Sequence, residues 1–160
     1  MRIIVCSDTH RNYYALQKII DKHPNADMFI HLGDGRYESD KLLSINPQLQ
    51  NRFFYVKGNC DLACMDSEML TLWAENHKII AVHGHNHGVK YSLEHLKKLA
   101  LENNCDIILY GHTHIRHMKY EDGIYTMNPG SASAPRDSHK PSYGIIDITE
   151  SGILKNIADV

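Results

Sequence analysis

Acidic, amide and imidazole side chains directly follow five apolar runs of this sequence, and their chemistry is that of metal ligands. The seven candidate donors are Asp8, His10, Asp34, Asn59, His83, His112 and His114. Oxygen and imidazole donors without thiolate suit manganese, iron, nickel, cobalt or zinc. Seven donors exceed the three protein ligands that a catalytic zinc ion usually takes. They fit two divalent cations about 3.5–4 Å apart that share a carboxylate.

The spacing within these sets helps the side chains converge. Asp8 and His10 are two residues apart, and so are His112 and His114. Residues i and i+2 of an extended chain project to the same side, so we expect each pair to point at one centre. A glycine directly precedes three of the seven donors. Glycine allows the sharp turns and close backbone approach that such a centre needs.

The runs that carry the donors have the pattern of buried strands. Continuous, β-branched apolar runs are typical of strands covered on both faces, and they lie at 3–6, 28–31, 53–56, 78–82 and 107–110. Helical spacing occurs at 14–20, 40–45 and 92–103, and further strands are expected at 69–73, 118–120, 124–127, 143–148 and 153–157. Strands separated by helices pair parallel, whereas closely spaced strands pair antiparallel. We therefore expect one mixed α/β domain over residues 1–160, with the donors at the carboxyl ends of its strands.

The composition narrows the class of protein. Hydrophobic residues make up 42% and charged residues 22%, which excludes disordered, collagen-like and coiled-coil proteins. The formal charge of −2 gives no excess of positive charge with which to bind nucleic acid or an anionic membrane. No apolar run approaches the ~20 residues that span a bilayer. The four cysteines form no CxxC pair, so we expect reduced thiols in a cytoplasmic protein.

Five motifs, in this order, resemble the calcineurin-like metallophosphoesterase superfamily. They are Asp8-x-His10, Gly33-Asp34, Gly58-Asn59-x-Asp61, His83-Gly84 and Gly111-His112-x-His114. The short length and two further elements resemble the small bacterial and archaeal phosphodiesterase branch of this superfamily, the YfcE type. These elements are Asn128-Pro129-Gly130-Ser131 and Pro135-Arg136. The resemblance implies a four-layer α/β/β/α sandwich, in which two mixed sheets are flanked by helices.

The resemblance also implies a ligand set and an activity. Asp34 would bridge two cations, one held with Asp8, His10 and His114 and the other with Asn59, His83 and His112. We expect manganese, with iron, nickel, cobalt or zinc as alternatives. A hydroxide shared by the two cations would attack the phosphorus of a small phosphodiester or nucleotide, and we assign the catalytic role to Asp34, Asn59 and His83. The alternative is a non-catalytic protein-interaction scaffold, as in the retromer subunit that resembles this branch. A homo-oligomer stays open.

Four further residues are candidates for contact with the substrate: Arg11, Cys60, His85 and Arg136. Many relatives have histidine at the position of Cys60, and a thiol with a pKa near ~8.5 protonates a leaving group less well than an imidazole. The planar fork of an arginine fits a phosphate oxygen, or it stays solvated. We expect His85 at the edge of the site.

Each candidate also has an ordinary structural role as its alternative. Asp8 would cap the following helix, and Asp34 and Asn59 would be plain turn residues. The spacing His83-x-His85-x-His87 is similar to the HxHxDH segment of dinuclear zinc hydrolases, but the aspartate of that segment is absent. We expect His31 to be a hydrogen-bonded histidine of the core or directly behind the site. We place the remaining histidines at the surface: His23, His77, His87, His95, His117 and His139.

Overall fold

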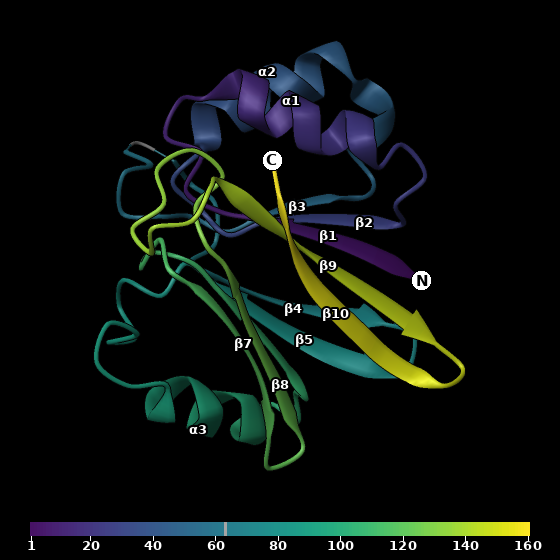
Figure 1. The fold of residues 1–160 in the computed structure, drawn as a ribbon, viewed down its shortest axis with the longest axis vertical. Coiled ribbons are helices and arrows are strands. Elements are labelled where there is room, and N and C mark those ends of the chain that lie inside the picture. The colour runs from purple at the N-terminus through teal and green to yellow at the C-terminus, as the bar shows by residue number, and fades with distance from the viewer. Residues whose placement is uncertain (63) are drawn as a thin grey trace.

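The computed structural model describes residues 1–62 and 64–160 and contains two five-stranded sheets that pack face to face (Figure 1). In spatial order, sheet A contains β10 (Gly152–Asp159), β9 (Ser142–Thr149), β1 (Arg2–Cys6), β2 (Met28–His31) and β3 (Phe53–Tyr55). Sheet B contains β4 (Met69–Ala74), β5 (His77–Val82), β6 (Ile107–Tyr110), β8 (Ile124–Pro129) and β7 (Arg116–Glu121). Strands β1, β2 and β3 pair parallel, as do β5, β6 and β8, and the outer pairs are antiparallel. The expected mixed sheets are confirmed.

Helices cover the outer face of each sheet. Helices α1 (Tyr13–Lys22) and α2 (Arg36–Ile45) lie against sheet A, and α3 (Glu94–Glu102) lies against sheet B (Figure 1). A short 3-10 helix, η1 (Pro47–Leu49), follows α2. The layers are therefore helix, sheet, sheet and helix, which confirms the expected α/β/β/α sandwich. None of the helices in the described part of the chain has the length and hydropathy of a membrane span.

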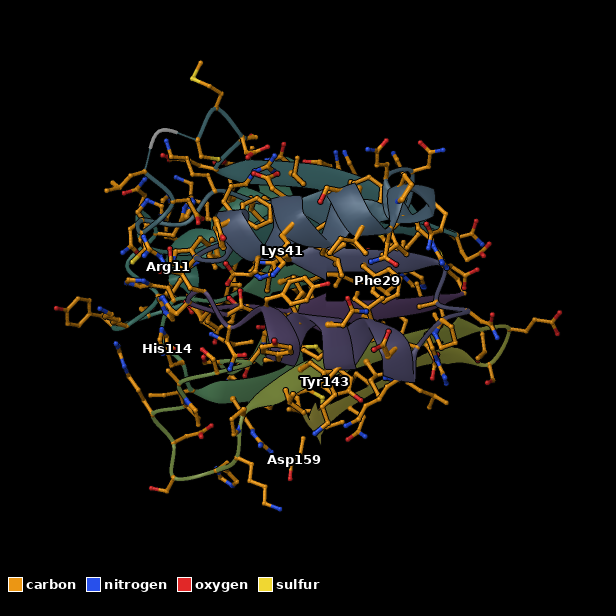
Figure 2. The ribbon with its side chains drawn as sticks, turned by 90° about the horizontal axis from the view of Figure 1, so that it is seen from above. Arg11, Phe29, Lys41, His114, Tyr143 and Asp159 are labelled. Atoms are coloured by element: carbon orange, nitrogen blue, oxygen red, sulfur yellow. The ribbon has the colours of Figure 1, made fainter. Side chains whose placement is uncertain are left out.

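The apolar runs fill two kinds of core because successive side chains of a strand point to opposite faces. Ile3 and Val5 pack between the two sheets, whereas Ile4 packs under the helices of sheet A. Phe29 and Tyr143 belong to this same outer layer, and Figure 2 shows Phe29 between α1 and α2 and Tyr143 along the edge of α1. Burial on both faces explains why these strands have no polar alternation in the sequence.

Helix α2 is longer than the sequence predicts. The expected helix covered 40–45, but α2 begins at Arg36. The Asp61 carboxylate, far along the chain, accepts hydrogen bonds from the backbone N–H groups of Gly35 and Arg36 at 3.1 and 3.0 Å. These are N–H groups that a helix start leaves without a partner. The cap comes from a distant loop, so no local pattern announces it.

His31 is fully buried at the end of β2, which confirms the expectation of a hydrogen-bonded histidine behind the site. The N–H of Gly33 donates to His31 Nδ1 at 3.2 Å, so Nε2 carries the proton and donates to Thr9 Oγ1 at 2.9 Å. Burial lowers the pKa of His31 to about 4. The neutral ring is therefore the form that fits the fold.

This burial predicts a loss of stability in mild acid. The pKa of His31 is about 6.5 in the unfolded chain. The stability that comes from keeping the ring neutral is therefore fully present above that pH and is lost as the pH falls toward 4. Because of His31 alone, the free energy of unfolding of the metal-free protein should be about 2–3 kcal/mol lower at pH ~4.5 than at pH ~7.5. Guanidinium titrations at several pH values measure the slope. His31→Gln should flatten it and the exposed-site control His139→Gln should not; an unchanged slope in His31→Gln would contradict the assignment.

Candidate metal centre

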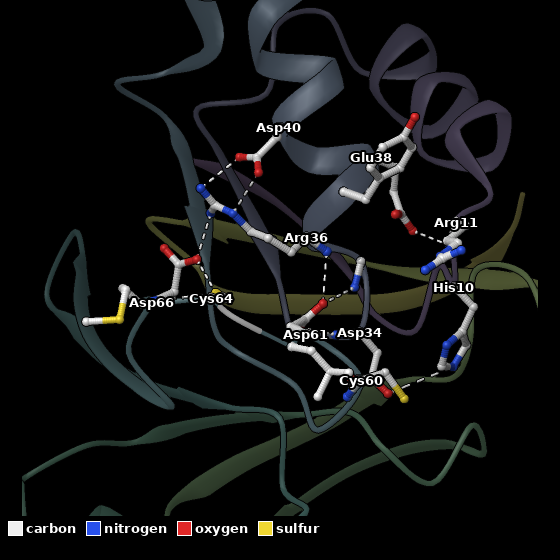
Figure 3. Close-up of a pocket in the computed structure, with 14 residues that line it drawn as sticks. His10, Arg11, Asp34, Arg36, Glu38, Asp40, Cys60, Asp61, Cys64 and Asp66 are labelled. Carbon is white, nitrogen blue, oxygen red and sulfur yellow. Dashed lines mark hydrogen bonds and ion pairs between the residues drawn. The ribbon is translucent and has the colours of Figure 1, made fainter.

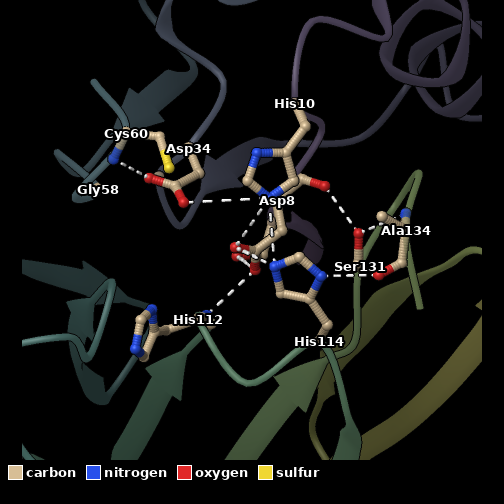
Figure 4. Close-up of polar contacts among 12 residues, drawn as sticks. Asp8, His10, Asp34, Gly58, Cys60, His112, His114, Ser131 and Ala134 are labelled. Atoms are coloured by element: carbon tan, nitrogen blue, oxygen red, sulfur yellow. Dashed lines mark hydrogen bonds and ion pairs between the residues drawn. The ribbon is translucent and has the colours of Figure 1, made fainter. Parts of the chain in front are cut away.

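The seven candidate donors lie at one rim, where the carboxyl ends of strands from both sheets meet. Sheet A supplies Asp8, His10, Asp34 and Asn59 from the loops after β1, β2 and β3. Sheet B supplies His83, His112 and His114 from the loops after β5 and β6. Figure 4 shows the side chains of Asp8, His10, Asp34 and His114 gathered at this rim.

Asp8, His10 and His114 form the tightest group. Nε2 of His114 lies 3.2 Å from Asp8 Oδ1 and also 3.2 Å from His10 Nε2. His10 Nε2 lies 3.9 Å from Asp8 Oδ1. The donor atoms of these three residues all lie within 4.8 Å of one another, so one cation could bind all of them.

Asp34 lies between this group and a second one. Its Oδ2 is 4.0 Å from His10 Nε2 and 3.6 Å from His83 Nε2. His83 Nε2 also lies 3.1 Å from Asn59 Oδ1. The ring of His112 stands 5.1 Å from the ring of His83, and no described group of donor atoms within 4.8 Å includes His112. The structure thus brings six of the seven candidates close at their donor atoms and places His112 beside them.

Two of the imidazoles are fixed from behind. His114 Nδ1 donates to the carbonyl of Ala134 at 2.6 Å, and His83 Nδ1 donates to the carbonyl of Leu32 at 2.7 Å. With the proton on Nδ1, the lone pair of Nε2 faces the centre. A metal-binding histidine is usually oriented in this way, with its second nitrogen bonded to a carbonyl or carboxylate.

The Asp8 carboxylate is fully buried, and only one of its oxygens is hydrogen-bonded. Its Oδ2 accepts from the Ser7 hydroxyl at 2.5 Å and from the His112 backbone N–H at 3.1 Å. Oδ1 has no hydrogen-bond partner among the described residues. Burial raises the pKa of Asp8, but the nearby imidazoles of His114 and His83 and the hydrogen bond from Ser7 outweigh it and hold the pKa below its usual value. A buried anion with one free oxygen is suited to a cation, so these residues fit divalent metal ions.

The backbone at the rim differs from the expected extended chain. Five of the seven candidates have a positive φ: Asp8 (55°), His10 (44°), Asp34 (58°), His112 (68°) and His114 (61°). The paired side chains therefore converge through left-handed turns, and the argument from extended i, i+2 geometry was wrong. Non-glycine residues seldom adopt this region, and such strain gathers at functional sites.

Two glycines permit the close approach of the loops. A Cβ at Gly58 would lie 2.1 Å from Asp34 Oδ1, and one at Gly111 would lie 2.0 Å from Ser7 Oγ. The backbone N–H of Gly58 and that of Asp34 both donate to Asp61, at 2.7 and 2.8 Å. Asp61 therefore ties the loop after β3 to the loop after β2.

Asp61 also accepts from the Tyr55 hydroxyl at 2.6 Å. Burial raises the pKa of Asp61, but the hydrogen bonds from Tyr55 and from backbone N–H groups have the larger effect, so the pKa lies below its usual value. Asp61 thus stays ionised and positions the loop that carries Asp34. Ser131 acts similarly behind Asp8, because its hydroxyl donates to the Asp8 carbonyl at 2.7 Å. The motif around Ser131 was visible in the sequence, but this contact was not.

The four substrate candidates surround the centre at different distances. Arg11 and Arg136 are exposed, and the Arg136 backbone N–H donates to the His114 carbonyl at 2.9 Å. The Cys60 backbone N–H donates to Asp34 Oδ1 at 2.7 Å, which places Cys60 beside the centre. His85 is half-buried with its ring 5.4 Å from that of His83. All four therefore lie at or next to the rim.

One structural alternative for the candidates does not hold, and several histidines are less exposed than expected. The cap of helix α1 is Asn12, whose side chain accepts from the Ala15 backbone N–H at 3.1 Å, so Asp8 is not that cap. His87, expected at the surface, is half-buried, with its ring 5.2 Å from that of His95. Three other expected surface histidines are also half-buried: His23, His77 and His117.

The protein has close relatives in sequence. It is 36% identical over 149 residues to a probable metallophosphoesterase, YsnB, of Bacillus subtilis, across 92% of this chain and 85% of the relative. It is 27% identical over 169 residues to the phosphodiesterase YfcE of Escherichia coli, across 92% of this chain and 88% of the relative. The expected resemblance to the YfcE type is confirmed.

Solved structures share the fold. A conserved protein of Streptococcus pneumoniae, described as a predicted phosphoesterase, superposes with a TM-score of 0.84 at 29% identity over 99% of this chain and 88% of that one. Vps29 of Entamoeba histolytica complexed with Zn²⁺ superposes with a TM-score of 0.74 at 23% identity over 99% of each chain, a likeness of fold alone. A family model described as the calcineurin-like phosphoesterase superfamily domain matches residues 1–151. This chain therefore belongs to the calcineurin-like phosphoesterase superfamily.

Proposed function

We propose that this protein is a phosphodiesterase that hydrolyses small phosphodiesters with two divalent cations. The observation that carries the proposal is the position of Asp34, whose Oδ2 lies 4.0 Å from His10 Nε2 and 3.6 Å from His83 Nε2. One carboxylate thus stands between two sets of donors. A shared carboxylate of this kind is typical of dinuclear hydrolases.

The proposed ligand sets use all seven candidates. Asp8, His10, Asp34 and His114 would hold one cation; Asp34, Asn59, His83 and His112 would hold the other. When bound, two such cations supply hydroxide near neutral pH and neutralise charge on the phosphate in the transition state. Manganese is our first choice, because oxygen and imidazole donors suit it. Asp34, Asn59 and His83 face the reacting group in this arrangement.

The chain's own cations complete the proposed phosphate site. Arg11 directly follows His10, and the Arg136 backbone N–H donates to the His114 carbonyl, so both arginines lie next to the first ligand set. Both side chains are exposed and free to close on a phosphate oxygen. His85 lies beside His83 at the opposite edge and completes the border.

Cys60 sets the proposed preference for leaving groups. Its thiol lies close to the donor atoms of His10 and Asp34. A thiol protonates a leaving group less well than an imidazole does. Esters whose leaving group needs little protonation, such as phenolates, should therefore react best.

Several features of the chain support the wider proposal. Both sheets share one apolar core, which supports a single domain over 1–160. The charge of −2 argues against long nucleic acids as substrates. The four cysteines are free thiols, which supports a cytoplasmic location. A homo-oligomer is compatible with the structure. A non-catalytic protein-interaction scaffold is the second candidate, because the fold is shared with vacuolar protein sorting 29 (Vps29), which is named for sorting and not for an enzyme activity.

Turnover of bis(p-nitrophenyl) phosphate separates the enzyme from the scaffold. The protein, first stripped with a chelator, should release nitrophenolate only after Mn²⁺ is restored, and elemental analysis should find two metal ions per chain at saturation. Iron, nickel, cobalt and zinc are tested in parallel. Absence of turnover with every one of these metals would end the phosphodiesterase proposal.

A further inference from the structure

A pocket of 780 Å³ opens directly beside the candidate metal centre. His10, Asp34 and Cys60 line its inner end. The start of α2 and the described residues after Asp61 line the rest. In Figure 3, Arg11 and His10 lie on one side of the pocket, and Asp66 and Cys64 lie on the other. The volume is in the range of small-molecule sites, about 300–1,000 Å³.

The outer walls of the pocket carry large apolar side chains that nothing covers among the described residues. Tyr37 is 69% exposed, Leu62 is 86% exposed and Met65 is 99% exposed. Single exposed apolar residues are ordinary, but three around one pocket next to a reactive centre indicate a ligand surface. Tyrosine rings and methionine sulfur atoms also make favourable contacts with aromatic rings.

Apart from Asp34 at the inner end, the acidic residues of the pocket already have partners within the protein. The Arg36 guanidinium binds Asp40 at 2.7 Å and Asp66 at 2.9 Å. Glu38 accepts from the Arg11 backbone N–H at 2.8 Å. Asp61 is fully occupied by the backbone of the neighbouring loops and by Tyr55. Each of these four carboxylates already accepts from a donor within the protein, and Arg36 offsets part of their charge, so we take the ligand of this pocket to be uncharged.

We propose that this pocket binds a flat, uncharged aromatic group of the substrate, of the nucleobase or aryl class, while the phosphate lies at the metal centre. The inference rests on the proposed function, because it assigns the ester substituent that the site accepts. The ring would pack against Tyr37 and Met65 at the outer wall. Its phosphate would stay near His10 and Asp34 at the inner end, within reach of Arg11.

Binding of simple monoesters to the Mn²⁺-loaded protein tests this pocket without turnover. Calorimetry compares phenyl phosphate and adenosine 5′-monophosphate with methyl phosphate, which has the same head group but no ring. We expect at least one ring-bearing ligand to bind about tenfold more tightly than methyl phosphate, equivalent to ~1.4 kcal/mol. In the variant Tyr37→Ala/Met65→Ala this advantage should fall to about twofold, with the affinity for methyl phosphate unchanged.

A matched control and two contrary outcomes make the result decisive. The variant Tyr91→Ala/Met118→Ala removes the same residue types from exposed positions outside the pocket and should bind like the parent protein. Equal affinity for all three monoesters, or tighter binding of choline phosphate, would overturn the pocket assignment even if diesters are hydrolysed. Conversely, a retained preference for rings in a protein that cleaves no diester would support the pocket and refute the enzyme.

Discussion

Asp34→Asn should lower kcat/KM for bis(p-nitrophenyl) phosphate by about a thousandfold or more, equivalent to ~4 kcal/mol of transition-state stabilisation. The reason is the position of Asp34 between His10 and His83, where one carboxylate serves both proposed cations. An amide keeps the shape but removes the negative charge and one strong donor oxygen. No other single substitution should cost as much. Steady-state kinetics, with metal content measured on the same samples, check the prediction.

Cys60→Ala is the natural comparison, because Cys60 touches Asp34 through its backbone N–H, which alanine keeps. This variant should lose much less activity than Asp34→Asn. A loss as large as that of Asp34→Asn would make the thiol part of the chemistry. If Asp34→Asn instead retained most of its activity and both metal ions, the bridging assignment would be wrong.

Gly58→Ala should disrupt the centre although it changes no donor. The added Cβ would lie 2.1 Å from Asp34 Oδ1 and 2.4 Å from the Asp34 backbone nitrogen, both far inside contact distance. The loop must shift, and the hydrogen bonds from Gly58 to Asp61 and from Cys60 to Asp34 must lengthen. We expect kcat/KM to fall by about a hundredfold or more. The free energy of unfolding should fall by about 1–3 kcal/mol.

Gly88→Ala serves as the control for a lost glycine. Gly88 has a φ of +66°, but an added Cβ there would meet nothing within 4 Å. The variant should lose some stability and keep its metal content and activity. If Gly58→Ala behaved like this control in metal content and turnover, the close packing of Gly58 on Asp34 would not be needed for metal binding or catalysis.

The sequence predicted the strands well because a strand that is buried on both faces is a continuous apolar run in the sequence. Runs such as Met28–His31 and Ile107–Tyr110 are bounded as expected. The convergence of the candidate donors was predictable for a related reason: parallel strands end at one edge, so polar residues that follow them lie close together. The left-handed backbone at Asp8 and His10 could not be foreseen, since no glycine marks it and it depends on contacts with distant loops.

The pocket beside the centre was missed for a different reason. Its walls come from the first turn of α2 and from the segment after Asp61, which look like an ordinary helix start and an ordinary loop. Exposure of side chains is a property of the folded chain, not of its pattern. The one available signal was the pair Leu62 and Met65, two large apolar residues in a polar loop.

The division of donors between the two sheets has a mechanical consequence. Each proposed cation would be gripped by residues of both sheets: Asp8, His10 and Asp34 with His114 in one case, and Asp34 and Asn59 with His83 and His112 in the other. Ions held in this way would link the two sheets of the sandwich to each other. Binding that favours the folded chain adds to its stability, so we expect the unfolding temperature of this protein to rise with the concentration of the divalent metal that it binds.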